Sequence, residues 1–290
     1  MNFFDRFSQP RLILLDGAIG SQLEARGVNT TLPLWSTIAL LSKDGRRILR
    51  AIHSEYVQAG AEILTANTFR TNPYTLKKEH LESRAKELTR IAVEEARSAC
   101  ETLMAGVFIA GSVAPVEDCY SPELVPPDQE LLDDHRRHID HLYAAHVDLI
   151  LIETMNTIRE AMIALGYSKQ TQLPVWISFI CKDPEHLLSG ESLEQAIEDC
   201  EHLKPDAILI NCVEVGLMEK NLEALRSLTE LPIGGYANVL KKGSSTKFEI
   251  LPQDYAKHVK EWVDRFRLKI VGGCCGTTPK HIHYLRDLLE

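Results

Sequence analysis

The chain alternates between short apolar runs and longer amphipathic runs, and this alternation is the feature that most constrains its fold. Eight apolar runs have the length of β-strands, and most are continuously apolar rather than alternating in polarity. Such runs indicate parallel strands that are buried on both faces. The predicted strands are Arg11–Gly17, Glu62–Phe69, Gly106–Val113, Asp148–Met155, Pro174–Ile180, Ala207–Val213, Pro232–Asn238 and Lys269–Gly276.

An amphipathic run follows each predicted strand. The expected helices are Gly45–Gly60, with a shorter one at Ser21–Arg26, then Leu81–Leu103, Gln129–Ala145, Ile158–Ser168, Ser192–His202, Met218–Leu228, Gln253–Phe266 and Lys280–Leu289. Eight such pairs favour a closed (β/α)8 barrel, which needs about 250 residues. An open doubly wound sheet is the alternative, but its nucleotide-binding form requires G-x-G-x-x-G, and Asp16–Gly20 lacks the third glycine. We therefore predict an α/β fold with one TIM barrel domain over residues 1–290, and an active site at the carboxyl ends of its strands.

Composition narrows the kind of partner that this chain binds. A net charge of −9 argues against a nucleic-acid surface, and no apolar run approaches the length needed to cross a membrane. The cysteines number seven, an odd count, and no apolar leader stands at the N-terminus, so we expect a reducing, cytoplasmic location. The partners expected are small molecules. The sequence contains no signal for an oligomeric state.

Two adjacent cysteines, Cys274 and Cys275, follow the last predicted strand within a glycine-rich segment. Neighbouring side chains on a strand point to opposite faces, so the pair can bind one object only if the strand has ended. Cys212 ends the predicted sixth strand, and in a ring of eight strands it lies two strands from the pair. Three thiolates suit Zn²⁺. Inert buried thiols, or a disulfide between the adjacent pair, are the alternatives.

Polar residues end the predicted strands, where a barrel would bring them to one mouth. They are Asp16, Gly17, Asn67, Thr68, Ser112, Glu153, Thr154, Ser178, Asn211, Tyr236 and Asn238, besides the three cysteines. Among them, Asn67, Thr68 and Ser178 are candidates to bind a substrate carboxylate, although they would equally satisfy backbone groups. Asp16 and Gly17 either contact substrate or form a structural turn.

Other residues are expected to have structural roles. His135, His138 and His141 recur at helical spacing within a charged helix, which predicts solvated surface histidines. Cys100 and Cys200 lie in helical patterns and are expected to pack in the core. The segment 114–128, rich in proline, predicts a long loop on the catalytic face. Cys119 in that loop is the only further cysteine expected near the mouth.

Six segments together resemble the zinc-dependent homocysteine S-methyltransferases. They are residues 16–23, 65–69, 110–113, 153–154, 211–212 and 272–279. This family includes enzymes that use S-methylmethionine or betaine, and the homocysteine-binding module of cobalamin-dependent methionine synthase. The chain departs from the family pattern at Ala114, Ala237 and Ser21, none of which is a candidate metal ligand.

The resemblance implies that Cys212, Cys274 and Cys275 hold Zn²⁺, and that the homocysteine sulfur takes the fourth position. It also implies that Glu153 holds the homocysteine ammonium. Asn211 and Asn238 are expected to support the ligands, and Asn238 is also a candidate to contact the substrate. The product would be methionine, formed when the metal-bound thiolate displaces a methyl group from a cationic donor.

Trp35, after the first predicted strand, is expected to stack on the donor cation or simply to pack against the long loop. The length of the chain favours S-methylmethionine or another sulfonium as the donor, with betaine as the alternative. A zinc-thiolate barrel that binds a ligand without turnover, or a thiol-redox protein, are the other classes of function. Against the redox class, the adjacent cysteines lack the C-x-x-C spacing.

Overall fold

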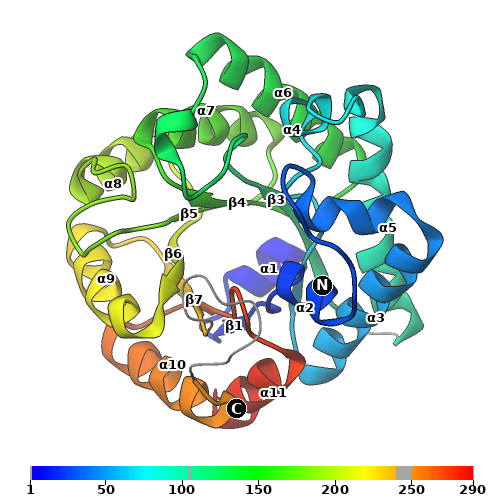
Figure 1. Cartoon of the computed structure of the whole chain (residues 1–290). Coiled ribbons are helices and arrows are strands. Elements are labelled where there is room, and N and C mark those ends of the chain that lie inside the picture. Colours follow the sequence, from blue (N-terminus) through cyan, green and yellow to red (C-terminus); the bar gives the residue numbers. More distant parts are fainter. Residues whose placement is uncertain (1, 104–105, 240–249, 290) are drawn as a thin grey trace.

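The computed structural model describes residues 2–103, 106–239 and 250–289, and its centre is a ring of eight parallel strands (Figure 1). Each strand pairs with its sequence neighbours, and β1 pairs with β8. The strands are β1 (Ile13–Leu14), β2 (Ile63–Thr65), β3 (Phe108–Val113), β4 (Leu149–Met155), β5 (Val175–Phe179), β6 (Ala207–Glu214), β7 (Ile233–Asn238) and β8 (Ile270–Val271). The prediction of a (β/α)8 barrel is confirmed.

The ring closes between β1 and its two neighbours. Ile13 and Leu14 are in register with Ile270 and Val271 of β8. On the other side, a single bridge joins Leu15 to Ile63 of β2. The backbone N–H of Asp16 also donates to the carbonyl of Ile63 at 3.0 Å. The shortest strands are therefore held from both sides, and every strand has its carboxyl end at the same face.

Helices surround the ring (Figure 1). The α-helices that follow the strands are α2 (Gly20–Ala25), α3 (Lys43–Ala59), α4 (Pro73–Lys77), α5 (Ala85–Thr102), α6 (Asp128–Ala144), α7 (Ile158–Ser168), α8 (Leu193–Leu203), α9 (Val215–Leu228), α10 (Pro252–Phe266) and α11 (Pro279–Leu289). Within the described ranges, four 3-10 helices lie in the connections, at Trp35–Leu41, Glu82–Arg84, Pro122–Leu124 and Lys169–Thr171. No helix in the described residues is both long and apolar enough to cross a membrane.

Local sequence explains where several helices begin. Ser42, Ser192 and Asn72 each use a side-chain oxygen to accept a hydrogen bond from a backbone N–H in the first turn of α3, α8 and α4. The predicted helix Leu81–Leu103 is in fact a 3-10 turn followed by α5. The pattern also missed α4, the 3-10 helix at Trp35 and a short N-terminal helix, α1 (Phe3–Phe7).

Two layers of apolar side chains make the core. The larger layer lies between the outer surface of the strands and the helices, whereas the smaller layer fills the barrel itself. At the amino ends of the strands, α1 lies behind the ring in Figure 1 and brings Phe3 against Trp176 and Phe108, with ring centroids 5.5 and 5.1 Å apart. Arg6 of α1 pairs with Glu62 at 2.7 Å. The bottom of the barrel is therefore plugged, and the opposite mouth is left for a site.

Candidate active site

Three cysteine sulfurs converge at the mouth of the barrel. Cys212 lies near the end of β6, and Cys274 and Cys275 follow β8 after the strand has ended. Their Sγ atoms lie within 4.8 Å of one another, and those of Cys212 and Cys274 are 2.8 Å apart. All the cysteines are free thiols, so a disulfide between the adjacent pair is not formed. In the part of the chain that the structure describes, this is the one group of side chains able to hold a metal ion.

Backbone irregularities aim these residues inward. The pairing of β6 with β7 shifts register between Asn211 and Glu214, and Cys212 has a left-handed φ of 57°. In a regular strand, Asn211 and Cys212 would point to opposite faces. The shift releases Cys212 toward the cavity, while Asn211 stays buried and accepts hydrogen bonds from the Thr154 N–H and the Ser178 hydroxyl.

Asn238, at the end of β7, ties the two ligand-bearing segments together. Its Nδ2 donates to the carbonyl of Cys212 at 2.9 Å, and its Oδ1 accepts from the N–H of Cys275 at 3.0 Å. The neighbouring Ala237 carbonyl accepts from the N–H of Cys274. Asn238 does not line the cavity, so its place fits the expected support of the ligands rather than substrate contact.

The three thiols influence one another's ionisation. Hydrogen bonds from Cys212 and Cys274 hold the pKa of Cys275 well below its ordinary value. The hydrogen bonds to Cys274 and Cys275, together with burial, raise the pKa of Cys212. The cluster thus favours one thiolate stabilised by two thiols. Ionising all three sulfurs in this buried place requires a cation beside them.

The sulfurs lie in a cavity of about 350 Å³. Its walls include predicted residues at several strand ends, namely Asp16, Gly17, Asn67, Ser112, Glu153, Thr154, Cys212, Tyr236, Cys274 and Cys275, together with Trp35 of the 3-10 helix after β1. The long loop after β3 contributes Asp118, Cys119 and Tyr120 to the walls of the cavity, as expected for a loop on the catalytic face. A cavity of this size suits small molecules.

Like Asp16, Glu153 on β4 is a buried carboxylate of this cavity. It accepts hydrogen bonds from the Ser112 hydroxyl at 2.5 Å and from the Tyr236 hydroxyl at 3.2 Å. Burial raises its pKa to about 7, although these two hydrogen bonds oppose the shift. A carboxylate that is costly to ionise alone is a favourable partner for a substrate cation. Ser112 and Tyr236 were recognised as strand-end residues, but their contact with Glu153 has no signal in the sequence.

The other candidates for substrate contact divide into two groups. Asn67 lines the cavity, and its Nδ2 donates to the Ser36 carbonyl. Asp16 also lines it, but its carboxylate accepts from the N–H and hydroxyl of Thr65, each at 2.9 Å. Thr68 and Ser178 lie outside the lining, where their hydroxyls satisfy Ser112 and Asn211.

Aromatic side chains form the wall near the first loop. Trp35 packs edge-on against Phe69 with ring centroids 5.3 Å apart, and both line the cavity. The indole lies directly over Gly20, where an added Cβ would come within 2.1 Å of it. Glycine at the start of α2 therefore makes room for Trp35 at the cavity, where the first loop was expected to place it.

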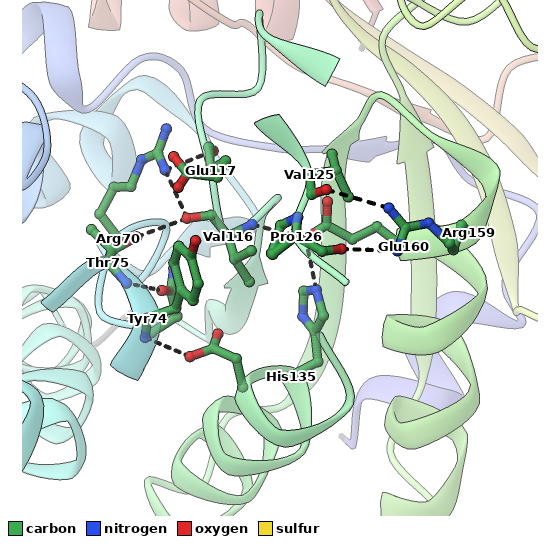
Figure 2. Close-up of polar contacts among 12 residues, drawn as sticks. Arg70, Tyr74, Thr75, Val116, Glu117, Val125, Pro126, His135, Arg159 and Glu160 are labelled. Carbon is green, nitrogen blue, oxygen red and sulfur yellow. Dashed lines mark hydrogen bonds and ion pairs between the residues drawn. The ribbon is translucent and has the colours of Figure 1, made fainter. Parts of the chain in front are cut away.

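The histidine prediction is wrong for two of the three residues. His135 and His138 are each only 1% exposed, because they lie on the buried face of α6 rather than on its solvent-exposed face. The Nε2 atom of His135 lies 3.0 Å from Glu160 (Figure 2), and that of His138 lies 3.2 Å from the Ser112 carbonyl. The charged residues of α6 concealed which of its faces is buried. Cys100 and Cys200 are buried as predicted, and Cys119 reaches the cavity.

Comparison with known proteins agrees with the family resemblance seen in the sequence. A family model described as homocysteine S-methyltransferase matches residues 13–289. Homocysteine S-methyltransferase 2 from Zea mays is 29% identical, over 96% of this chain and 90% of that protein. The homocysteine methyltransferase MmuM from Escherichia coli, in its metallated form, has a TM-score of 0.85 at 27% identity, with 98% of each chain covered. Its apo form has a TM-score of 0.75 at 26% identity, over 99% of this chain and 98% of that one. Because the family model spans the barrel and includes all three clustered cysteines, this chain belongs to the homocysteine S-methyltransferase family.

Proposed function

We propose that this chain transfers a methyl group from a sulfonium donor to homocysteine, giving methionine, with Zn²⁺ held by Cys212, Cys274 and Cys275. One observation carries the proposal. Three sulfurs within 4.8 Å of one another form part of a cavity that is also lined by the buried carboxylate of Glu153, which suits an ammonium group. The sulfurs suit a soft metal and a thiol substrate, and the carboxylate suits the amino end of the same substrate.

The cysteine cluster fits a tetrahedral zinc site with one open position. At a Zn–S bond of about 2.3 Å, ligand sulfurs lie about 3.8 Å apart. The Cys212 and Cys274 sulfurs, at 2.8 Å, would therefore move apart by about 1 Å, which side-chain rotation can supply. The description of the Escherichia coli relative as metallated supports a metal at this place.

The protein groups would each have a defined part in the reaction. Glu153 would hold the ammonium of homocysteine and so bring its thiol to the cysteines, with Ser112 and Tyr236 fixing the carboxylate. Bound Zn²⁺ would supply the charge that removes the thiol proton and leaves a nucleophilic sulfur. Holding both substrates in one cavity supplies much of the remaining acceleration.

The aromatic wall supports a cationic donor. Trp35 and Phe69 both line the cavity, and a sulfonium or a quaternary ammonium is attracted to aromatic rings. We favour a sulfonium such as S-methylmethionine, and betaine is the alternative. Methyl transfer measured side by side with the two donors decides between them. Turnover with betaine and none with any sulfonium would contradict the donor assignment.

Metal analysis tests the ligand set. The purified chain should carry about one zinc per molecule, and Cys212→Ala should lose both the metal and methyl transfer. Cys200→Ala is the matched control, because Cys200 is buried in α8 and distant from the cluster in the fold. Full zinc content in Cys212→Ala would contradict the ligand set.

A further inference from the structure

Arg70, in the segment between β2 and α4, is a buried cation without a carboxylate partner. It is 4% exposed, and its Nη1 donates only to backbone carbonyls, to Glu117 at 2.7 Å and to Val116 at 3.4 Å (Figure 2). Its Nε is buried and has no hydrogen-bond partner. Within residues 2–103, 106–239 and 250–289 no ion pair involves Arg70. The carboxylate of Glu117 is instead 2.5 Å from Lys78.

This arrangement leaves the positive charge of Arg70 without an ion-pair partner among the described residues. An arginine does not release its proton in a protein, so the guanidinium remains charged even when buried. Burial lowers its pKa, and negative charges on Asp118, Glu117 and Glu160 oppose that shift from beyond ion-pair distance. A guanidinium has five donors in a planar fork, and two neutral carbonyls use only part of this capacity. The partner that would match the remaining charge and donor capacity is an anion such as a carboxylate.

The position of Arg70 indicates which molecule would supply such an anion. Arg70 lines the same cavity as the cysteines, together with Phe69, over whose ring its guanidinium carbon lies at 5.5 Å, and Trp35. We propose that Arg70 binds the carboxylate of the methyl donor. The donor class is then a sulfonium that also carries a carboxylate, so a simple alkyl sulfonium would be used poorly. This inference rests on the proposed function.

The donor, rather than homocysteine, is the better source of this carboxylate. Homocysteine carries its carboxylate and ammonium on one carbon, so Glu153 on β4 would keep both near the strand ends. Arg70 lies beyond the end of β2 and contacts the loop after β3, beside the aromatic pair that suits the donor cation. A donor with its cation on the aromatic wall and its carboxylate at Arg70 would present its methyl group to the cysteines.

A second role of Arg70 has to be separated in the test. Its bonds to the carbonyls of Val116 and Glu117 also hold the loop after β3, as does the hydroxyl of Thr75, which donates to Val116 at 3.1 Å (Figure 2). Thr75→Val removes a bond to the same loop without removing a charge. It is therefore the matched control for a purely structural role of Arg70.

The experiment compares donors in the wild-type chain and its variants. S-methylmethionine and its carboxamide differ only at the carboxylate, which the amide replaces with a neutral group of similar size, and homocysteine and its carboxamide make the same comparison for the acceptor. In the wild type, kcat/KM should fall about 10- to 100-fold with the donor carboxamide, the range of a charge-assisted hydrogen bond. Arg70→Gln should show a similar fall with S-methylmethionine but stay within about threefold of wild type with the donor carboxamide. Thr75→Val should change both donors by the same factor.

Each other outcome contradicts the inference in a recognisable way. Equal use of the two donors by the wild type would overturn it without any variant. An equal loss for both donors in Arg70→Gln, matching Thr75→Val, would leave Arg70 a loop contact only. If Arg70→Gln instead abolished the preference for homocysteine over its carboxamide, the carboxylate at Arg70 would be that of the acceptor. Absence of turnover with every donor in the zinc-loaded wild type would overturn the proposed function itself.

Discussion

At the scale of single residues, Glu153 combines burial with two hydroxyl donors, and this combination makes it sensitive to substitution. Glu153→Gln keeps the size of the side chain but removes the charge that would pair with the substrate ammonium. A charge-assisted contact of this kind is worth about 1.5–3 kcal/mol, so kcat/KM for homocysteine should fall about 10- to 100-fold. Steady-state kinetics at limiting homocysteine measures the loss.

The control for Glu153 is a strand-end residue outside the cavity. Ser178→Ala should change kcat/KM for homocysteine by less than about threefold, since the Ser178 hydroxyl donates to Asn211 and does not line the cavity. Zinc content should be unchanged in both variants. Wild-type kinetics in Glu153→Gln would show that the ammonium binds elsewhere.

Asp134, on the buried face of α6, predicts a pH dependence of stability. Burial raises its pKa to about 6 from 3.8, so the folded chain keeps this proton at pH values where the unfolded chain has lost it. The free energy of unfolding therefore loses up to about 3 kcal/mol from this group as pH rises from about 4 to about 7. Asp134→Asn cannot ionise, so its stability relative to wild type should increase over the same range.

Urea unfolding at several pH values tests whether the stability of Asp134→Asn relative to wild type rises with pH. Asn at position 134 retains an oxygen to accept from the Tyr74 N–H. The control is Asp133→Asn, whose side chain is half exposed on the next position of the helix. Its effect should stay within about 0.5 kcal/mol throughout. A stability difference for Asp134→Asn that stays constant, or shrinks as pH rises, would refute the assignment.

At the scale of elements, β7 connects the two segments that carry the cysteines, through the side chain of Asn238. Asn238→Ala removes both hydrogen bonds that position Cys212 and Cys275. Loss of such supporting partners costs metal sites about 10- to 100-fold in affinity. Zinc affinity measured by competition with a chelator should fall by this factor.

A matched asparagine is available for comparison with Asn238. Both side-chain polar atoms of Asn221, on α9, are buried and have no hydrogen-bond partner among the residues that the structure describes. Asn221→Ala should therefore leave zinc affinity within about twofold of wild type. Equal affinities in Asn238→Ala and wild type would mean that the backbone alone positions the ligands.

The order of elements could be predicted from the sequence, whereas loop contacts could not. Each strand is buried on both faces, so its apolar run is visible without any knowledge of its neighbours. Strand ends were less accurate, because Arg11–Gly17 and Lys269–Gly276 shrink to two residues each where the chain turns into the site. The contacts of Arg70 and Tyr120 depend on the irregular path of the loop after β3, which has no periodicity to predict it.

The histidines of α6 show a related limit. Charged residues cover most of the surface of this helix. Its sequence therefore did not reveal the buried stripe that contains His135 and His138. Their partners, Glu160 and the Ser112 carbonyl, come from other elements. Buried polar contacts between elements are set by packing rather than by local pattern, so only the structure reveals them.

At the scale of the whole molecule, the aromatic packing that stabilises the barrel and the proposed reaction site lie at opposite ends of the barrel. Phe3 of α1 packs on Trp176 and Phe108 at the amino ends of the strands. Phe3→Ala should reduce the free energy of unfolding by about 3 kcal/mol, through lost burial and a cavity. Zinc content and kcat/KM should remain within about twofold of wild type, because the cysteines lie at the other end. Chemical unfolding and metal analysis on one sample measure both.

Phe4 provides the control for Phe3, because it is 54% exposed on the same helix. Phe4→Ala should change the free energy of unfolding by less than about 0.5 kcal/mol. A loss of zinc in Phe3→Ala that matched its loss of stability would show that the two ends are coupled.

The barrel also explains why cysteines 62 residues apart could be grouped from the sequence alone. The carboxyl ends of parallel strands lie at one face of the barrel. Residues far apart in the sequence are therefore close in space when their strands are near neighbours in the ring. Cys212 lies on β6 and Cys274 follows β8, and these two strands are separated only by β7. The register shift in β6 could not be predicted, because it depends on the pairing between strands.

The left-handed backbone at Cys212 has a consequence for how this fold tolerates change. A side chain other than glycine costs about 1 kcal/mol or more in that conformation, so the fold without metal carries local frustration at its own ligand. Metal binding would offset this cost, whereas selection for thermal stability of the metal-free chain would favour glycine there and remove a ligand. Screens that reward a higher melting temperature in the absence of zinc should therefore select against Cys212, whereas the same screens with zinc bound should retain it.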